Sequence, residues 1–141
     1  MKTVLIYFSY TGKTKILAEQ KAKEEGADLL PLTLVKPRGN FLTYTAGSLS
    51  ARSHKKAKLN SFDTDLSQYE RVIIAMPIWA GYPAPPINNV LPLIKRGSSV
   101  ELIFTSGSGN SQKSGEYVKS VLSGNGVKVT GITDIKASEI K

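Results

Sequence analysis

The sequence has no cysteine, a single histidine (His54) and a single tryptophan (Trp79) among its 141 residues. The absence of cysteine excludes disulfides, thiolate metal sites and a thiol nucleophile, and His54 lies among lysines, where a metal ligand is not expected. Hydrophobic residues make up 40% and charged residues 21%, which is too polar for a membrane span, and the first apolar segment, Val4–Phe8, covers only five residues before polar ones follow. We therefore expect neither a membrane span nor a signal peptide, and we predict a cytoplasmic protein.

Acidic residues are also scarce, since 11 Asp and Glu stand against 19 Lys and Arg and leave a net charge of +8. Much of the excess lies in residues 29–62, which contain six basic residues and no acid. These are Lys36, Arg38, Arg52, Lys55, Lys56 and Lys58. Such a stretch suits an acidic protein partner, a phosphate-bearing cosubstrate or a nucleic acid, and it equally suits a solvated surface. Nucleic acid is the weakest alternative, because the stretch has few aromatics for base stacking and matches no nucleic-acid-binding motif.

Strand-like and helix-like segments alternate at short spacing, which is typical of a parallel sheet with helices on both faces. The expected strands are Val4–Phe8, Leu29–Val35, Arg71–Met76, Val100–Thr105 and Val127–Ile132. The expected helices are Lys13–Glu25, Pro86–Ile94 and Gln112–Ser123, with a further short helix within Tyr44–His54. Pro92 should kink or shorten the second helix. Because only eight residues follow Thr133, a fifth full helix is not expected.

The most informative stretch follows the first expected strand and reads Ser9-Tyr10-Thr11-Gly12-Lys13-Thr14. Ser9, Thr11 and Thr14 bring hydroxyl donors, and Gly12 allows the backbone to approach an oxygen closely. A helix that starts here offers N–H groups and the positive end of its dipole to an anion. The stretch therefore predicts a phosphate site; the alternative is a hydroxyl-rich helix cap without a ligand.

Two common phosphate motifs do not fit the sequence. The Walker motif G-x-x-x-x-G-K-[ST] would need glycine at the position of Tyr7. The dinucleotide motif G-x-G-x-x-G fails at the first loop, where Gly12 is the only glycine, and fails again after Gly107, because Gln112 replaces the last glycine. What remains is Ser-x-Thr-Gly-x-Thr directly after a strand.

Two further loops follow the third and fourth expected strands. Pro77–Pro86 has four prolines, which fix the backbone in advance, and it offers Trp79 and Tyr82 for stacking on a flat ring. The alternative is that Trp79 stacks on no ligand and is an aromatic residue of the core or of a lid. Ser106–Ser111 is polar and rich in glycine. Because all three loops follow parallel strands, we expect them at the carboxyl edge of the sheet, where ligands bind in open α/β folds.

These three loops resemble, in order and spacing, the phosphate loop, the isoalloxazine loop and the third flavin-contacting loop of the flavodoxin family. The matching stretches are Ser9–Thr14, Pro77–Tyr82 and Thr105–Gly109. The resemblance covers nearly the whole chain. The length of 141 residues predicts a single domain, residues 1–141. The resemblance implies a doubly wound α/β three-layer sandwich whose five-stranded parallel sheet has the order 2-1-3-4-5. The sequence departs from the family in its last helix, which we expect to be short or absent.

The resemblance also implies FMN as the cofactor and a set of residues that would bind it. These are Ser9, Tyr10, Thr11, Gly12, Lys13, Thr14, Pro77, Ile78, Trp79, Ala80, Gly81, Tyr82, Thr105, Ser106, Gly107, Ser108 and Gly109. Those of the first loop would hold the phosphate. The backbone around Trp79, Ala80 and Gly81 would lie near the reactive edge of the ring.

An FMN protein of this kind would be an electron carrier or a small reductase that passes electrons from NAD(P)H to a quinone or similar acceptor. A redox partner protein is expected, and the basic stretch would suit an acidic one. The alternative is a flavodoxin-fold binding or regulatory module without redox activity, because fold does not fix function. The sequence departs from the electron carriers in lacking their acidic surface and an aromatic in the third loop before Tyr117. General acid–base catalysis is not expected, since the three loops contain no His, Asp or Glu.

Overall fold

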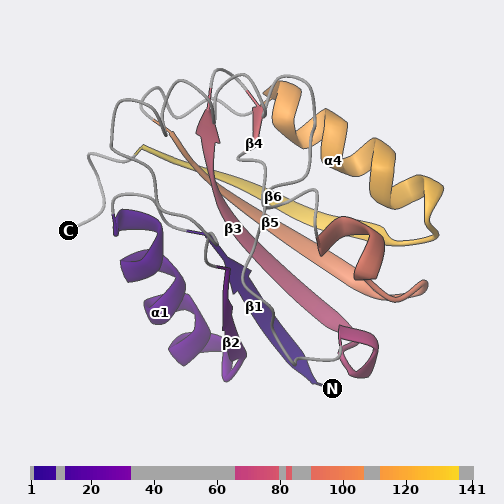
Figure 1. Cartoon of the computed structure of the whole chain (residues 1–141), viewed down its shortest axis with the longest axis horizontal. Helices are drawn as coiled ribbons and strands as arrows, with labels where there is room; N and C mark the ends of the chain where they lie inside the picture. The colour runs from indigo at the N-terminus through magenta and orange to yellow at the C-terminus, as the bar shows by residue number, and fades with distance from the viewer. Residues whose placement is uncertain are drawn as a thin grey trace.

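The computed structural model describes residues 2–8, 12–32, 66–79, 82–83, 90–106 and 112–136. In chain order its elements are β1 (Thr3–Tyr7), α1 (Lys13–Glu25), β2 (Asp28–Pro31), the 3-10 turn η1 (Leu66–Gln68), β3 (Arg71–Trp79), β4 (Tyr82–Pro83), the 3-10 turn η2 (Leu91–Leu93), β5 (Ser99–Ser106), α4 (Gln112–Gly124) and β6 (Lys128–Lys136). Figure 1 shows β1, β3, β5 and β6 running side by side, with α1 and α4 at opposite corners.

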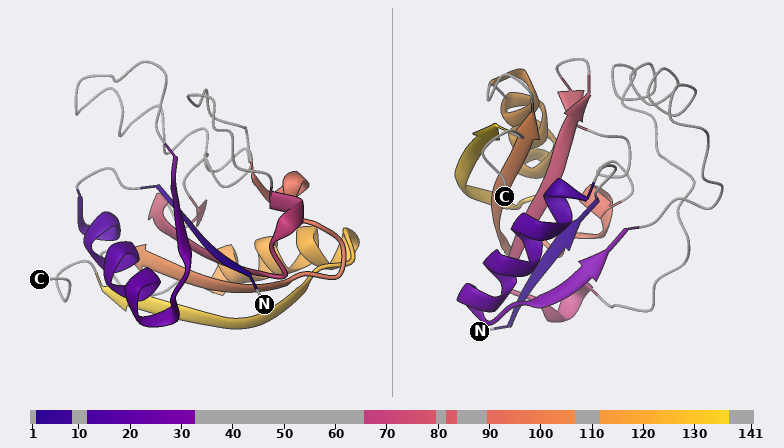
Figure 2. Two further views of the ribbon diagram at one scale, coloured as in Figure 1. Left: turned by 90° about the horizontal axis from the view of Figure 1, so that it is seen from below. Right: turned by 90° about the vertical axis from the view of Figure 1, so that its left-hand side faces the viewer.

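The central sheet has the order β2-β1-β3-β5-β6, and every neighbouring pair along this path is parallel. Counted over the parallel strands alone, this is the order 2-1-3-4-5, so the predicted fold class is confirmed. The inner strands are continuous apolar runs, with Val4–Phe8 and Val72–Met76 buried throughout. Such runs belong to strands that are covered on both faces. Figure 2 shows the twist of the sheet from β2 to β6.

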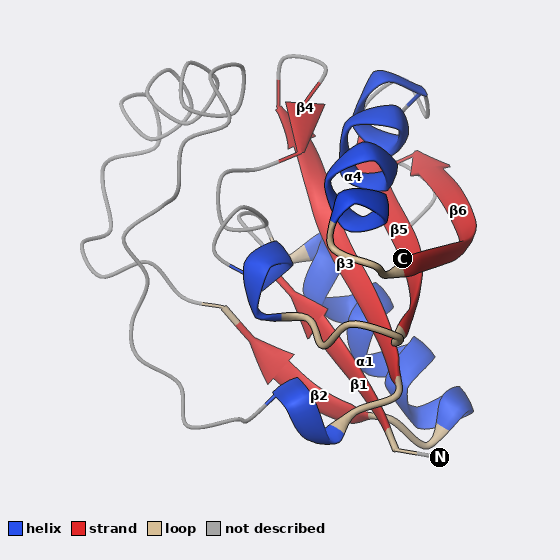
Figure 3. Ribbon diagram, turned by 90° about the vertical axis from the view of Figure 1, so that its right-hand side faces the viewer, coloured by secondary structure: helices blue, strands red, loops and turns tan. Residues whose placement is uncertain are grey.

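Each face of the sheet carries its own apolar cluster. On one face Ala18 and Ala22 of α1 pack with Leu5 and Ile73. On the other face η1, η2 and α4 pack on the alternate residues of the same strands, around the fully buried Phe104. Figure 3 shows α4 in front of the sheet and α1 behind it. The first crossover therefore covers one face and the described parts of the later crossovers cover the other, which places the topological switch point between β1 and β3.

The loop expected from Pro77 begins as strand instead, so that prediction is wrong for its first residues. β3 continues through Trp79, and Trp79 pairs in antiparallel register with Tyr82 of β4. Proline is tolerated here because the Ala75 carbonyl faces β1, accepting the Phe8 N–H at 3.2 Å. Backbone groups two residues apart point to the same side of a strand, so an N–H at position 77 would also point toward β1. Because β1 has already ended there, the N–H that proline lacks has no partner to lose.

The ends of two other strands, β6 and β2, differ less from the predicted ones. β6 runs to Lys136, four residues past the expected end at Ile132, because its polar residues can stay exposed on an edge strand while still pairing with β5. β2 starts at Asp28, and the part of the expected strand beyond Leu32 lies outside the described residues. The possible helix within Tyr44–His54 also lies outside them.

The helix expected over Pro86–Ile94 is described only from Val90, where it becomes the 3-10 turn η2 with Pro92 near its start. Val90, Leu91 and Ile94 are buried, as the apolar spacing predicts. The residues before Val90 lie outside the described part, so the length of this helix stays a prediction, and Pro92 itself lies in a 3-10 turn. None of the helices in the described ranges is long and apolar enough to cross a membrane.

α4 comes close to β6 at Gly115. A Cβ added to Gly115 would lie 2.9 Å from Cδ1 of Ile132, which is closer than real Cβ contacts come. That atom is the outer end of a flexible side chain that is 40% exposed, so a small movement of Ile132 would make room for a methyl group at position 115.

The amino end of the sheet carries an ion-pair network on the α1 face, formed by Lys21, Glu25, Arg71 and Glu101. Arg71 Nη2 lies 2.9 Å from Glu101 Oε2 and 3.3 Å from Glu25 Oε1. Lys21 Nζ lies 3.2 Å from the same Glu25 oxygen and 3.7 Å from Glu101 Oε1. Two bases thus balance two acids, with side chains that are 21 to 29% exposed.

Candidate functional site

The three sequence-predicted loops follow β1, β3 and β5, whose parallel strands end at one edge of the sheet. α1 begins at the same edge, because it follows β1 after a short connection. In Figure 1 this carboxyl edge lies toward the upper left, where α1 starts. The expected convergence of the loops at one edge is thus what the strand order requires.

Gly12 caps the first turn of α1 in a left-handed conformation, with φ +92° and ψ −11°. This conformation is disfavoured for residues with a side chain, so glycine is needed here for the backbone and not only for space. Within the described residues no side-chain hydrogen bond caps the helix at Gly12, and the first turn of α1 contains no acid. No described atom lies within 4 Å of where a Cβ of Gly12 would stand. The start of α1 is therefore suited to an anion.

Thr14 lies in the first turn of α1 and is only 4% exposed. Its Oγ1 lies 2.9 Å from Oγ1 of Thr105, and either hydroxyl can be the donor. Thr105 is likewise 4% exposed. The two hydroxyls therefore form a buried polar pair in which each side chain has the other as a partner.

This hydroxyl pair joins the first loop to the third across a strand. β1 and β5 are not neighbours, because β3 lies between them, and the residue of β3 in register with Thr105 is Pro77. Two strand spacings amount to roughly 10 Å, so the first turn of α1 must lean across β3 for Thr14 to reach Thr105. The structure thus brings together two of the predicted site residues from separate loops, which sequence spacing alone does not reveal.

The remaining predicted residues divide into described and undescribed ones. Ile78 is partly buried against the cluster on the α4 face, and Ser106 ends β5 next to Thr105. The backbones of Lys13, Trp79 and Tyr82 lie in α1, β3 and β4. Eight predicted residues lie outside the described part of the chain: Ser9, Tyr10, Thr11, Ala80, Gly81, Gly107, Ser108 and Gly109.

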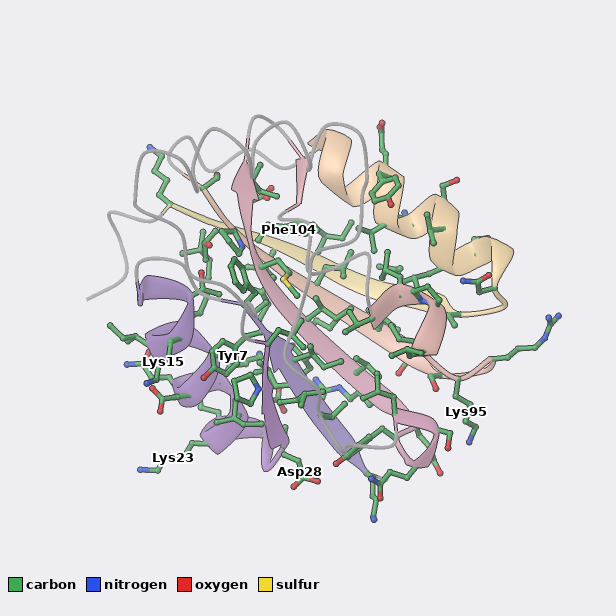
Figure 4. All side chains as sticks on the ribbon, viewed as in Figure 1. Tyr7, Lys15, Lys23, Asp28, Lys95 and Phe104 are labelled. Atoms are coloured by element: carbon green, nitrogen blue, oxygen red, sulfur yellow. The ribbon has the colours of Figure 1, made fainter. Side chains whose placement is uncertain are left out.

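The described side chains around this edge include a phenol, lysines and an acid. Tyr7, the last residue of β1, packs in the α1 cluster (Figure 4), where burial and the nearby Glu19 raise its pKa. It therefore stays a neutral phenol at physiological pH. Lys15 and Lys23 point away from the sheet on the outer side of α1 (Figure 4). Sequence reasoning missed one acid, Asp134, which the unexpected length of β6 pairs with Phe104 near the carboxyl end of β5.

The strand order, the switch point and the loops at the carboxyl edge define a doubly wound fold of the flavodoxin type. A flavoprotein in complex with FMN from Lactobacillus acidophilus NCFM is similar, with a TM-score of 0.74 and 24% identity over 93% of this chain and 91% of that one. A candidate flavoprotein from Bacteroides eggerthii DSM 20697 has a TM-score of 0.80 and 23% identity over 99% and 92% of the two chains.

A flavodoxin mutant from Fusobacterium nucleatum bound to flavin mononucleotide has a TM-score of 0.55 and 19% identity, over 92% of this chain and 68% of that one. No protein-family model matches the sequence, and the curated proteins give no match either. At these identities the likeness establishes the fold, which is flavodoxin-like.

Proposed function

We propose that this protein binds FMN at the carboxyl edge of its sheet and serves as a redox protein. The observation that carries the proposal is the start of α1, where left-handed Gly12 and buried Thr14 follow a strand in the pattern Ser-x-Thr-Gly-x-Thr. Two proteins of similar fold are described with bound FMN or flavin mononucleotide, which supports the same cofactor here.

The donor set at this edge fits a phosphate. Backbone N–H groups in the first turn of a helix have no partner inside the helix, and a hydroxyl such as that of Thr14 can donate. The first turn of α1 contains no acid that would repel a dianion. Gly12 leaves the approach free of a Cβ. These features suit an ionised phosphate monoester better than a neutral or cationic ligand.

FMN, when bound, supplies reversible transfer of one or two electrons. The residues of this chain would hold and orient it. The first turn of α1 would bind the phosphate, and the turn between β3 and β4 would lie near the ring by resemblance to the family. No Asp or Glu occurs in residues 71–100 or 102–115, so these segments would not oppose negative charge on a reduced ring.

The redox role itself has two forms, a one-electron carrier and a small reductase that takes hydride from NAD(P)H and reduces a quinone or similar acceptor. The basic stretch Lys36–Lys58 lies outside the described residues and is proposed to dock an acidic redox partner. If so, the association rate should fall as salt rises, and Lys55→Glu with Lys56→Glu should slow it further. A rate that neither salt nor this double change alters would assign the stretch to a solvated surface. A cytoplasmic location belongs to the same proposal.

The decisive experiment is a visible absorption spectrum of the purified protein, followed by titration of the flavin-free form with FMN and with riboflavin. We expect saturable binding of FMN and much weaker binding of riboflavin, which has no phosphate. A protein that is colourless as purified and does not titrate with FMN would instead favour a binding or regulatory module on the same fold.

A further inference from the structure

We propose that Thr105 is a positioning residue that orients the hydroxyl of Thr14 toward the phosphate of FMN. The inference rests on the proposed function and assigns Thr105 a role different from the direct flavin contact that the family resemblance implies. It starts from the 2.9 Å separation of the two Oγ1 atoms, which come from α1 and β5.

The direction of this hydrogen bond depends on what else Thr14 binds. A hydroxyl has one proton to donate and can accept through its lone pairs, so without a ligand either threonine can be the donor. The oxygens of an ionised phosphate only accept. Thr14 must therefore give its proton to the phosphate, and it can keep Thr105 as a partner only by accepting. Phosphate binding thus requires Thr105 to donate to Thr14.

This order of donors strengthens the contact with the phosphate. Accepting a hydrogen bond polarises the O–H group of Thr14 and makes it a better donor. It also holds the Thr14 side chain in one staggered position, so less freedom is lost when the ligand binds. Without Thr105 the Thr14 hydroxyl would remain in place but would lose both advantages.

Thr105 is well placed to act as a fixed reference for Thr14. It lies in β5, which pairs with β3 on one side and β6 on the other, so that Thr105 is in register with Pro77 and with Ile135. A side chain held on an interior strand keeps its position better than one on a loop. The rigid sheet would therefore set the orientation of the hydroxyl at the start of α1.

The test measures the dissociation constants of FMN and riboflavin by quenching of flavin fluorescence in wild type and in the variants Thr105→Val, Thr14→Val and the double variant. Thr105→Val should weaken FMN binding about three- to tenfold, the range for loss of one neutral hydrogen bond, with less than about a twofold change for riboflavin. In the Thr14→Val background the same change should have no further effect on FMN, because Thr105 acts through Thr14.

Two controls make this measurement specific. Thr105→Ser keeps the hydroxyl and should restore nearly the wild-type ratio of FMN to riboflavin affinity. Thr130→Val removes a hydroxyl that also donates a hydrogen bond, to the Val100 carbonyl at 3.3 Å, but near the amino end of the sheet. It should leave both affinities unchanged. If Thr105→Val fails to fold, Thr105→Ala takes its place in the same cycle.

Two results would overturn the proposal. One is an equal loss of FMN and riboflavin affinity in Thr105→Val. The other is that adding Thr105→Val to the Thr14→Val variant lowers FMN affinity as much as it does in wild type. Either would mean that Thr105 contacts the flavin directly. An unchanged FMN affinity in Thr105→Val would also reject the positioning role. In all these cases wild type still binds FMN, whereas wild type that binds no FMN rejects the proposed function as well.

Discussion

The two ends of the sheet handle polar groups differently. At the amino end, Arg71 lies between Glu25 and Glu101, and the charges neutralise one another within the chain. At the carboxyl end, a buried polar contact joins two uncharged hydroxyls, Thr14 and Thr105, beside the start of α1 at the left-handed Gly12. The comparison suggests that the amino end contributes to stability and the carboxyl end to binding. The changes below test that division.

The largest effect is expected at the carboxyl end, for Thr14→Ala. Loss of one hydrogen bond to a charged oxygen costs roughly 1.5–3 kcal/mol, so FMN affinity should fall about tenfold to a hundredfold, with little change for riboflavin. Titration of the flavin-free protein with both ligands measures this. Lys21→Met, at the amino end, is the matched control and should leave FMN affinity unchanged. Equal losses in the two variants would break the division between the ends.

The next effect concerns the reduction potential of bound FMN, since the second and third loops have no acid. We expect the potential of the second one-electron reduction to be less negative than in acidic flavodoxins, and we expect Tyr82→Glu to lower that potential. A unit charge about 7 Å away at an effective dielectric near 20 is worth roughly 2 kcal/mol, which is on the order of 0.1 V. Spectroelectrochemical titration at neutral pH measures both proteins. A wild-type potential as low as that of acidic flavodoxins would contradict this electrostatic account. So would a potential that Tyr82→Glu leaves unchanged.

At the amino end, Arg71→Met should lower the free energy of unfolding by about 1 kcal/mol, the upper part of the range for partly exposed ion pairs. The reason is that Glu25 and Glu101 would then share only Lys21. Urea denaturation measures the difference, which should shrink in 1 M salt, where the screening length is about 3 Å. FMN affinity of the folded variant should not change. If Arg71→Met lowered FMN affinity and left the free energy of unfolding unchanged, the amino end would contribute to binding and not to stability, which contradicts the proposed division.

The smallest effect is a pH dependence of stability at the same end. Hydrogen bonds from Arg71 and Lys21 hold the pKa of Glu25 below its ordinary value of 4.5. A carboxyl with a lowered folded-state pKa adds stability above its ordinary pKa and loses that contribution as pH falls through the lowered value. The free energy of unfolding should therefore decrease below about pH 4.5. Glu25→Gln should flatten this dependence in urea melts recorded from pH 3 to pH 7, and an unchanged slope would contradict the assignment.

Much of the fold could be predicted from the sequence, because buried parallel strands are continuous apolar runs that stand out from their surroundings. The runs around Leu5, Ile73 and Leu102 gave the inner strands. The ends of strands were harder to predict. The sequence predicts that β3 ends before Pro77, whereas in the structure the strand continues. The N–H that proline lacks would have pointed to the side where β1 has stopped, so the pairing with β5 is unaffected. That depends on where a neighbouring strand ends, which is not encoded near Pro77.

The sequence predicts the residues of the candidate site within each loop, but it does not predict the contacts between the loops. Gly12 and Thr14 were identified from local chemistry, and the structure adds the left-handed conformation of one and the burial of the other. The bond between Thr14 and Thr105 spans 91 positions and depends on how α1 leans across β3. No local pattern carries that information. Asp134 was likewise missed, because its position follows from the register of β6 against β5.

The close approach of Gly115 to Ile132 shows how much variation this sequence can accept through evolution. A methyl group at position 115 would meet only the outer end of the Ile132 side chain, which is flexible and 40% exposed and can turn aside. Alanine at position 115 should therefore be acceptable at small cost, and a shorter residue at position 132 would remove even that cost. Because Gly115 lies in the first turns of α4, directly after the third loop, a side chain that moves at position 132 lets the helix start, where that loop ends, stay where it is.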